Sequence, residues 1–251
     1  MAGTIDVAGI SLSRFWHCFG TERHRASMET VVGLLKASGT NVLPINTHRL
    51  DERRDRSALE HGFDGVGYDA LGEHVDTASY VKMLNINLRT SAEAAVAATK
   101  LAFEMTGERV LKLEVLNPSL RGSQDGEVVE AARVLSAWDP SLIVLPLISN
   151  DLDTAKAAVD AGCPLLRVMG SDISSRAGIT DAGVFEEICT LGVPVVLDGG
   201  IGEVEHLQRA ADLGAAGALV NSVLFDRADQ APVSVMEEFA AAADRIFGSH
   251  L

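Results

Sequence analysis

The chain has little basic charge, few aromatic residues and no long apolar run. Its 35 acidic and 21 basic residues give a net charge of −14, which argues against nucleic acid as a main ligand because phosphate binding needs a basic surface. Aromatic residues make up only 5% of the chain. No apolar stretch approaches the roughly 18 residues that cross a bilayer, so we expect no membrane-spanning segment.

Cysteine is also scarce, with Cys18, Cys163 and Cys189 as an odd set that contains no Cys-x-x-Cys pair. This pattern excludes a disulfide framework or a zinc site of the usual spacing. The seven histidines show no ligand-like spacing either, so we predict no metal and no cofactor. The first residues have no basic region followed by an apolar one, so we expect no signal peptide and a cytoplasmic protein.

Short apolar runs alternate with amphipathic patterns along most of the chain. The later apolar runs are rich in Val, Ile and Leu, as buried parallel strands are. The eight predicted strands are Ser13–Cys18, Asn41–Asn46, Lys82–Asn87, Val110–Leu116, Leu142–Leu147, Leu165–Met169, Val193–Asp198 and Ala218–Asn221. The predicted helices are Ser27–Ser38, Ser91–Thr106, Asp125–Ala137, Asp151–Ala161, Asp181–Leu191, Glu203–Leu213 and Val233–Ile246.

A glycine follows four of these helices, at a position where a left-handed residue often ends a helix. These glycines are Gly39, Gly162, Gly192 and Gly214. Eight strand–helix units in about 250 residues predict an α/β fold, a (β/α)8 TIM barrel that spans residues 1–251 as one domain. A doubly wound open sheet is the alternative, but it usually has fewer strands and no Gly-x-Gly-x-x-Gly follows the first strand.

One polar stretch, residues 48–79, interrupts the alternation after the second predicted strand. It carries the charged run Asp51-Glu-Arg-Arg-Asp-Arg56 and several glycines. Such an insert is either a solvated excursion or a lid that contributes to a pocket, since it leaves the end of the barrel where active sites lie.

The fourth predicted strand places two charged side chains on one face. Side chains alternate across a strand, so Lys112 and Glu114 point into the barrel. A buried ion pair that fills the barrel is one interpretation. The functional one is a lysine whose lowered pKa makes its amine nucleophilic toward a carbonyl substrate, with Glu114 as a proton shuttle.

The seventh and eighth strands end in small and polar residues. Asp198 ends the seventh strand and precedes three glycines that let backbone amides approach a ligand. Loops after these two strands commonly hold phosphate in such barrels. The predicted phosphate and rim residues here are Gly199, Gly200, Gly202, Asn221 and Ser222.

Further candidates for the same rim follow other strands. Gly170 and Ser171 begin a second Gly/Ser-rich loop, in which Arg176 would pair with a phosphate or carboxylate, or else be solvated. His17 and His48 lie near the ends of the first two strands, where they would reach the rim or play a structural part.

Several motifs resemble the thiazole synthase family of thiamin biosynthesis. They are Lys112-Leu-Glu-Val115, Val144-Leu-Pro146, Asp160-Ala-Gly-Cys163, Val193-Pro-Val-Val-Leu-Asp-Gly-Gly-Ile-Gly202 and Leu219-Val-Asn-Ser222. The resemblance implies a barrel whose lysine, here Lys112, forms an imine with the ketone of 1-deoxyxylulose 5-phosphate. It also implies Glu114 and Asp198 as acid/base groups, and a small sulfur carrier protein that delivers sulfur from a C-terminal Gly-Gly thiocarboxylate.

The sequence departs from the family pattern at the substrate-facing rim. The third strand of thiazole synthases usually ends in Pro-Asn-Thr-Ala-Gly-Cys, whereas this one reads Met83-Leu-Asn-Ile-Asn-Leu-Arg89. The loop that usually reads Pro-Ile-Gly-Ser-Gly is Asp172-Ile-Ser-Ser-Arg176. A retained catalytic centre with a changed rim is similar to the 2-thiosugar (2-thioglucose) synthases of antibiotic biosynthesis, which act on a hexose 6-phosphate.

A hexose phosphate such as glucose 6-phosphate brings more hydroxyl groups, and Asn85, Asn87, His17, His48 and Ser174 are candidate partners for them. Thiazole synthesis remains an alternative, as does a lysine-imine aldolase or isomerase that needs no protein partner. A barrel without catalysis is a further alternative from a different class. We also expect a homo-oligomer.

Overall fold

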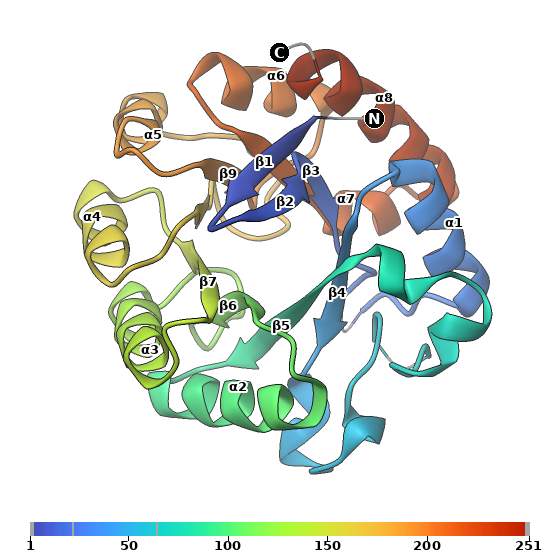
Figure 1. Ribbon diagram of the computed structural model, residues 1–251. Coiled ribbons are helices and arrows are strands. Elements are labelled where there is room, and N and C mark those ends of the chain that lie inside the picture. Colours follow the sequence, from blue (N-terminus) through green and yellow to red (C-terminus); the bar gives the residue numbers. More distant parts are fainter. Residues whose placement is uncertain (1–2, 22, 64, 249–251) are drawn as a thin grey trace.

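The computed structural model describes residues 3–21, 23–63 and 65–248. Within these residues, eight parallel strands form a nearly closed barrel surrounded by eight α-helices (Figure 1). Neighbouring strands follow the order β3-β10-β9-β8-β7-β6-β5-β4. The predicted (β/α)8 barrel is confirmed, and the open doubly wound sheet is not formed. The strands are β3 (Phe15–His17), β4 (Val42–Asn46), β5 (Val81–Arg89), β6 (Val110–Val115), β7 (Ile143–Ile148), β8 (Leu166–Val168), β9 (Val195–Asp198) and β10 (Gly217–Val220).

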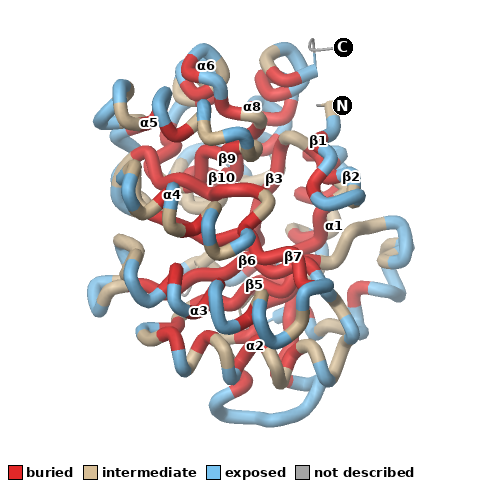
Figure 2. The backbone as a smooth tube through the Cα atoms, turned by 60° about the vertical axis from the view of Figure 1, so that its left-hand side comes forward, coloured by how far each residue is buried: buried red, intermediate tan, exposed pale blue. Residues whose placement is uncertain are grey.

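The helices form the outer layer and bury one face each against the strands, which are the most buried part of the chain (Figure 2). Ser91 caps α2 by accepting a hydrogen bond from the amide of Ala94, and Asp151 caps α4 in the same way. The helices are α1 (Met28–Ser38), α2 (Ala92–Thr106), α3 (Asp125–Trp138), α4 (Leu152–Asp160), α5 (Ala182–Cys189), α6 (Val204–Asp212), α7 (Ser222–Phe225) and α8 (Pro232–Phe247). The short α7 was not predicted, because four residues are too few to show a helical period. None of the helices among the described residues is both long and apolar enough to cross a membrane.

An antiparallel hairpin that the sequence analysis missed closes the N-terminal end of the barrel. Its strands are β1 (Thr4–Val7) and β2 (Ile10–Ser13). Ile5, Val7 and Leu12 pack against the inward side chains at the starts of the barrel strands. Both turn residues have positive φ, 51° at Ala8 and 81° at Gly9, as a two-residue hairpin turn requires. Ala-Gly is a weaker turn signal than Asn-Gly, and four-residue strands show little alternation.

The first and last strands of the order, β3 and β4, share no backbone ladder among the described residues. Near this gap, at the closed end, the end of β2 is bonded to the residue before β4. The amide and the hydroxyl of Ser13 both contact Asn41 Oδ1, at 2.8 and 2.9 Å, and the Asn41 amide donates to Ser13 Oγ at 2.9 Å. The hairpin is therefore fastened to the barrel beside this gap.

In the described part of the insert between β4 and β5 there are four short 3-10 helices, where the other units have an α-helix. They are η1 (His48–Asp51), η2 (Arg56–Ala58), η3 (Ala70–Glu73) and η4 (Thr77–Ser79). Leu50, Leu59 and Leu71 are buried against the barrel. The insert is therefore packed onto the fold, and the interpretation as a purely solvated excursion is wrong.

Candidate active site

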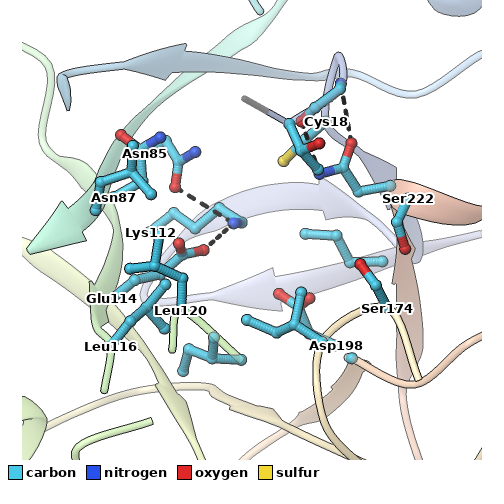
Figure 3. Close-up of a pocket in the computed structure, with 18 of the residues that line it drawn as sticks. Cys18, Asn85, Asn87, Lys112, Glu114, Leu116, Leu120, Ser174, Asp198 and Ser222 are labelled. Carbon is cyan, nitrogen blue, oxygen red and sulfur yellow. Dashed lines mark hydrogen bonds and ion pairs between the residues drawn. The ribbon is translucent and has the colours of Figure 1, made fainter. Parts of the chain in front are cut away.

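A charged centre lies inside the barrel at the carboxyl end of the strands. Lys112 and Glu114 come from β6 and Asp198 ends β9, and all three side chains are buried. Lys112 Nζ donates to Glu114 Oε1 and also to Asn85 Oδ1, the latter at 3.3 Å (Figure 3). The alternation of side chains along β6 thus places the lysine and its carboxylate together.

Arg167, in the middle of β8, was missed from the sequence and joins the two carboxylates. Its guanidinium donates to Asp198 Oδ2 from Nε at 2.7 Å and to Glu114 Oε1 from Nη2 at 2.8 Å. Nη1 donates to the carbonyl of Leu145 at 3.3 Å. The side chain is fully buried. An arginine in an otherwise apolar strand was the available signal, since a buried charge needs partners.

These four side chains balance one another, with two positive and two negative charges. Burial raises the pKa of Glu114, but the positive charges of Lys112 and Arg167 outweigh burial and hold that pKa below its ordinary value. Glu114 is therefore an ionised carboxylate that can accept a proton at neutral pH.

The pKa of Lys112 contradicts the sequence-based expectation. Burial is the largest influence and lowers this pKa, and the charge of Arg167 lowers it further. The negative charges of Glu114 and Asp198 raise it and prevail, so the pKa lies above its ordinary value. The prediction of a lowered pKa is wrong because it considered burial without the paired carboxylates. The resting amine is an ammonium, which must pass a proton to a neighbour before it can attack a carbonyl.

A cavity opens above this centre toward the rim of the barrel (Figure 3). One part of its wall is polar and another is formed by leucine and isoleucine side chains. Its lining includes Cys18, Thr21, Phe63, Asn85, Asn87, Leu88, Lys112, Glu114, Leu116, Leu120, Leu147, Ile173, Ser174, Asp198, Gly199, Gly200, Asn221 and Ser222.

Seven of the predicted rim residues line this cavity together with the three charged residues. They are Asn85, Asn87, Ser174, Gly199, Gly200, Asn221 and Ser222. Asn221 is already committed to the backbone of Gly20, since its Oδ1 accepts from the Gly20 amide at 3.0 Å and its Nδ2 donates to the Gly20 carbonyl at 2.9 Å. Asn221 therefore shapes the loop after β3.

The other predicted loop residues lie outside the cavity lining. The Gly202 amide donates to His206 Nδ1 at 3.1 Å, and Arg176 binds the carboxylate of Asp226 at 3.1 Å. The Gly170 amide donates to the Gly199 carbonyl at 3.3 Å, and Ser171 Oγ donates to the Gly178 carbonyl at 2.8 Å. The Gly170 contact joins the two glycine-rich loops, and the other three contacts fix the loop after β8 and the loop after β9 in place. Gly170, Ser171, Arg176 and Gly202 are not among the residues that line the cavity.

Neither predicted histidine is among the lining residues. His17 is buried in the barrel wall, where its Nε2 lies 3.0 Å from Ser38 Oγ, and burial lowers its pKa to about 4. His48 belongs to the insert, pairs with Glu60 at 3.1 Å and stacks on Phe63 at a ring separation of 4.7 Å. His48 therefore lies behind Phe63, which lines the cavity. The sequence analysis did not predict Phe63 as a site residue.

Left-handed backbone gathers around the cavity. Leu88, Leu120 and Ser174 line it with φ of 56°, 57° and 64°. Such conformations are unfavourable for residues other than glycine and tend to occur at functional sites. The sequence did not predict these conformations, because Leu and Ser rarely adopt positive φ and therefore give no signal of it.

Cys18, whose role the sequence left open, also lines the cavity. Burial raises the pKa of its thiol, so it is a neutral thiol at physiological pH. Among the described residues, no three His, Cys, Asp or Glu side chains converge in an arrangement that could hold a metal ion.

Comparisons with known proteins agree on one family. The chain matches the family model described as thiazole biosynthesis protein ThiG over residues 12–246. Thiazole synthase from Klebsiella pneumoniae (strain 342) is 30% identical over 231 residues, which are 91% of this chain and 84% of that protein. Thiazole synthase from Escherichia coli O9:H4 (strain HS) is 29% identical over the same shares.

Solved structures give a similar picture. The crystal structure of the Amycolatopsis orientalis BexX/CysO complex matches with a TM-score of 0.84 and 27% identity, covering 99% of this chain and 96% of that chain. Thiamine phosphate pyrophosphorylase from Pyrococcus furiosus shares the fold, with a TM-score of 0.58 and 16% identity over 94% of this chain and 97% of that chain. The chain therefore belongs to the thiazole synthase family of enzymes.

Proposed function

We propose that this enzyme forms an imine between Lys112 and a phosphosugar, glucose 6-phosphate, and places sulfur at C2 of the sugar. The sulfur comes from the C-terminal thiocarboxylate of a small carrier protein that ends in Gly-Gly, and the product is a 2-thiosugar phosphate. The observation that carries the proposal is the pairing of Lys112 with Glu114, linked through Arg167 to Asp198, beneath a rim that departs from the family pattern.

Proton transfer starts the reaction. The ionised Glu114 takes a proton from the Lys112 ammonium through their hydrogen bond, which supplies the free amine. A second proton moves between C1 and C2 of the open-chain aldose, and this produces a carbonyl at C2. Asp198 also lines the cavity, and Arg167 holds its carboxylate ready for that transfer. Lys112 then attacks C2, and water leaves as the imine forms.

The thiocarboxylate sulfur next attacks C2 of the imine and forms the C–S bond. Water then attacks the acyl carbon of the carrier, the sulfur–acyl bond breaks, and a carboxylate is left on the carrier. Expulsion of Lys112 leaves a thiocarbonyl at C2, and transfer of a proton from C1 back to C2 gives the aldose with a thiol at C2. The exchange replaces one oxygen by one sulfur on the sugar, so no oxidant or reductant is required.

The polar part of the cavity wall supports the proposal for the remaining groups of the substrate. Asn85, Asn87, Ser174 and Ser222 bring polar side chains to the cavity, and an unpaired buried hydroxyl would cost about 1–3 kcal/mol. The phosphate would lie at the backbone of Gly199 and Gly200, where no side chain blocks its approach. A Gly-Gly tail also has no side chains to clash in a narrow mouth.

A protein partner is supported by the family and by the BexX/CysO structure, which is itself a complex of two proteins. The main alternative is thiazole phosphate synthesis from 1-deoxyxylulose 5-phosphate, the activity that the related thiazole synthases imply. A lysine-imine aldolase or isomerase without a partner is the other alternative.

Borohydride trapping tests the proposal. The protein is incubated with a panel of phosphosugars, reduced, digested and analysed by mass spectrometry. Glucose 6-phosphate should add its mass, less one water and plus the reducing hydrogens, to the peptide that holds Lys112. The Lys112→Arg variant keeps the charge but loses the nucleophile, and should show no adduct.

Turnover separates the alternatives. With glucose 6-phosphate and loaded carrier, the product should carry one sulfur in place of one oxygen. Thiazole phosphate formed from 1-deoxyxylulose 5-phosphate and a glycine imine would overturn the thiosugar assignment. Equal turnover with free sulfide would remove the reason for a carrier, and an adduct that survives Lys112→Arg would remove the lysine from its role.

A further inference from the structure

Two buried asparagines connect the catalytic lysine to the insert between β4 and β5. Asn46 ends β4 and Asn85 lies beside it on β5, and both are about 4% exposed. Asn85 Oδ1 accepts from Lys112 Nζ at 3.3 Å, and Asn85 Nδ2 donates to Asn46 Oδ1 at 2.7 Å. Asn46 Nδ2 donates in turn to the carbonyl of Gly62 at 2.6 Å.

The insert fixes the direction of this series of hydrogen bonds, which we call the amide chain. A backbone carbonyl only accepts hydrogen bonds, so Asn46 must turn its NH2 group toward Gly62 and its oxygen toward Asn85. Asn85 must then donate to Asn46, and its own oxygen faces Lys112. The Gly62 carbonyl therefore fixes the orientation of both side-chain amides, so that the oxygen of Asn85 faces the Lys112 amine.

We propose that Asn46 is a positioning residue that couples the insert to Lys112, by holding Asn85 with its oxygen toward the amine. The inference rests on the proposed function in one respect, that Lys112 reacts through its amine. It adds a part of the chain, residues 48–79, to the machinery that controls that amine.

The insert also meets the cavity directly. Phe63, the residue after Gly62, lines the cavity and is stacked on His48. The antiparallel bridge between Asn46 and Glu60 fastens the same stretch to the end of β4, with the Asn46 amide donating to the Glu60 carbonyl at 2.8 Å. A ligand that displaces Phe63 would therefore also displace Gly62, whose carbonyl orients the side-chain amides of Asn46 and Asn85.

The amide oxygen acts on two states of the lysine. It stabilises the ammonium, and after imine formation it accepts the single remaining N–H of the iminium, which fixes the plane of the C=N bond. The other groups that face Lys112 are Glu114, Arg167, Asp198 and Cys18. Asn85 is the neighbour of Lys112 that hydrogen bonds connect to the insert, through Asn46 and the Gly62 carbonyl.

The test measures the amine without sugar or carrier. Formaldehyde forms an iminium with a free lysine amine, and cyanoborohydride reduces it to the methylamine, which mass spectrometry quantifies at the Lys112 peptide. The labelling rate is followed against pH in wild type, Asn46→Ala, Asn85→Leu and the double variant, with circular dichroism to confirm folding. The matched control is Asn41→Ala, at the opposite end of β4, whose side chain binds Ser13 and the Ser11 carbonyl.

We expect Asn85→Leu to move the labelling profile to lower pH by roughly half to one unit, because the ammonium loses an acceptor. Asn46→Ala should move it in the same direction, and should add nothing in the Asn85→Leu background. Asn41→Ala should leave the profile unchanged. Additive shifts, or no shift in folded Asn46→Ala, would overturn the coupling.

A failure here is distinct from a failure of the proposed function. If formaldehyde labelling shifts as expected while glucose 6-phosphate leaves no adduct, the coupling of Asn46 to Lys112 is supported and the substrate assignment is wrong. If glucose 6-phosphate is trapped while the labelling profiles of wild type and the variants coincide, the substrate assignment is supported and the coupling of Asn46 to Lys112 is wrong.

Discussion

The two ends of the barrel are built from the same strands but carry opposite chemistry. At the closed end, beneath the β1–β2 hairpin, inward side chains such as Met83 and Val110 are apolar and buried. Two residues further along the same two strands, the inward side chains are Asn85 and Lys112, which line the cavity. One end therefore provides stability from apolar burial, and the other concentrates charge that the fold must support.

The same change from an apolar to a polar inward side chain, over two residues, occurs on two further strands. On β9, Val196 of the closed end is followed by Asp198, and Leu165, just before β8, is followed after two residues by Arg167. The active site is therefore one layer of the barrel interior, and substitutions in the two layers should separate effects on turnover from effects on stability.

The largest effect is expected for Arg167→Met in the polar layer. Two carboxylates would then face the single positive charge of Lys112, and one of them would take up a proton. Turnover should fall on the order of 100-fold or more, and the free energy of unfolding should fall by about 3–5 kcal/mol, because a buried partner is removed. Enzyme assays and urea denaturation measure the two quantities. Arg167→Lys keeps the charge but not the planar fork, so it should lie between wild type and Arg167→Met; wild-type turnover in Arg167→Met would contradict the role of Arg167.

Leu12→Ala tests the closed end. This side chain is fully buried in the apolar cluster beneath the barrel, so its truncation should lower the free energy of unfolding by about 2–5 kcal/mol. The turnover of the folded fraction should not change, because the cavity lies at the other end. Urea denaturation and active-site titration on the same sample separate the two outcomes. A loss of turnover per folded molecule would show that the two ends are not independent.

His17 offers a third environment, a polar group buried without charge in the wall between the ends. Its pKa is about 4 in the folded chain, against about 6.5 when exposed. As pH falls below 6.5, the unfolded chain takes up the proton first, so stability is lost progressively down to about pH 4. The loss is on the order of 3 kcal/mol. His17→Gln should show a flatter dependence of unfolding free energy on pH between 7 and 4, and parallel pH profiles would contradict this.

Much of the polar layer was within reach of the sequence, because strand alternation placed Lys112 and Glu114 on one face. The same rule applied to Leu165–Met169 would have pointed Arg167 inward with Leu165. Asn46 was available in the same way, as a polar residue at the end of β4. Neither residue belongs to a recognisable motif, and a single polar residue in an apolar strand is a weak signal of function.

The rim was less predictable for a physical reason. Glycine and arginine were taken as phosphate ligands from their chemistry, yet the Gly202 amide binds His206 and Arg176 binds Asp226. Loop residues find partners through tertiary contacts that have no period in the sequence. The insert shows the same limit, since its composition marked it as polar but did not reveal Phe63 at the cavity.

The smallest effect is expected at the rim, for Gly200→Ala. Gly200 has a φ of 79°, and an added Cβ would clash with Ser171 Oγ and lie 3.0 Å from the Gly178 carbonyl. The loop must move, and with it the backbone at which the phosphate is proposed to bind.

The dissociation constant of the phosphosugar should rise by about tenfold, which is about 1.4 kcal/mol, as measured by calorimetry. The matched control is Gly192→Ala, which has a φ of 83° with no atom within 4 Å of the added Cβ, and therefore imposes similar backbone strain away from the cavity. Equal affinities in both variants, or equal binding of the dephosphorylated sugar by wild type, would place the phosphate elsewhere and leave the polar layer without a phosphate contact at this loop.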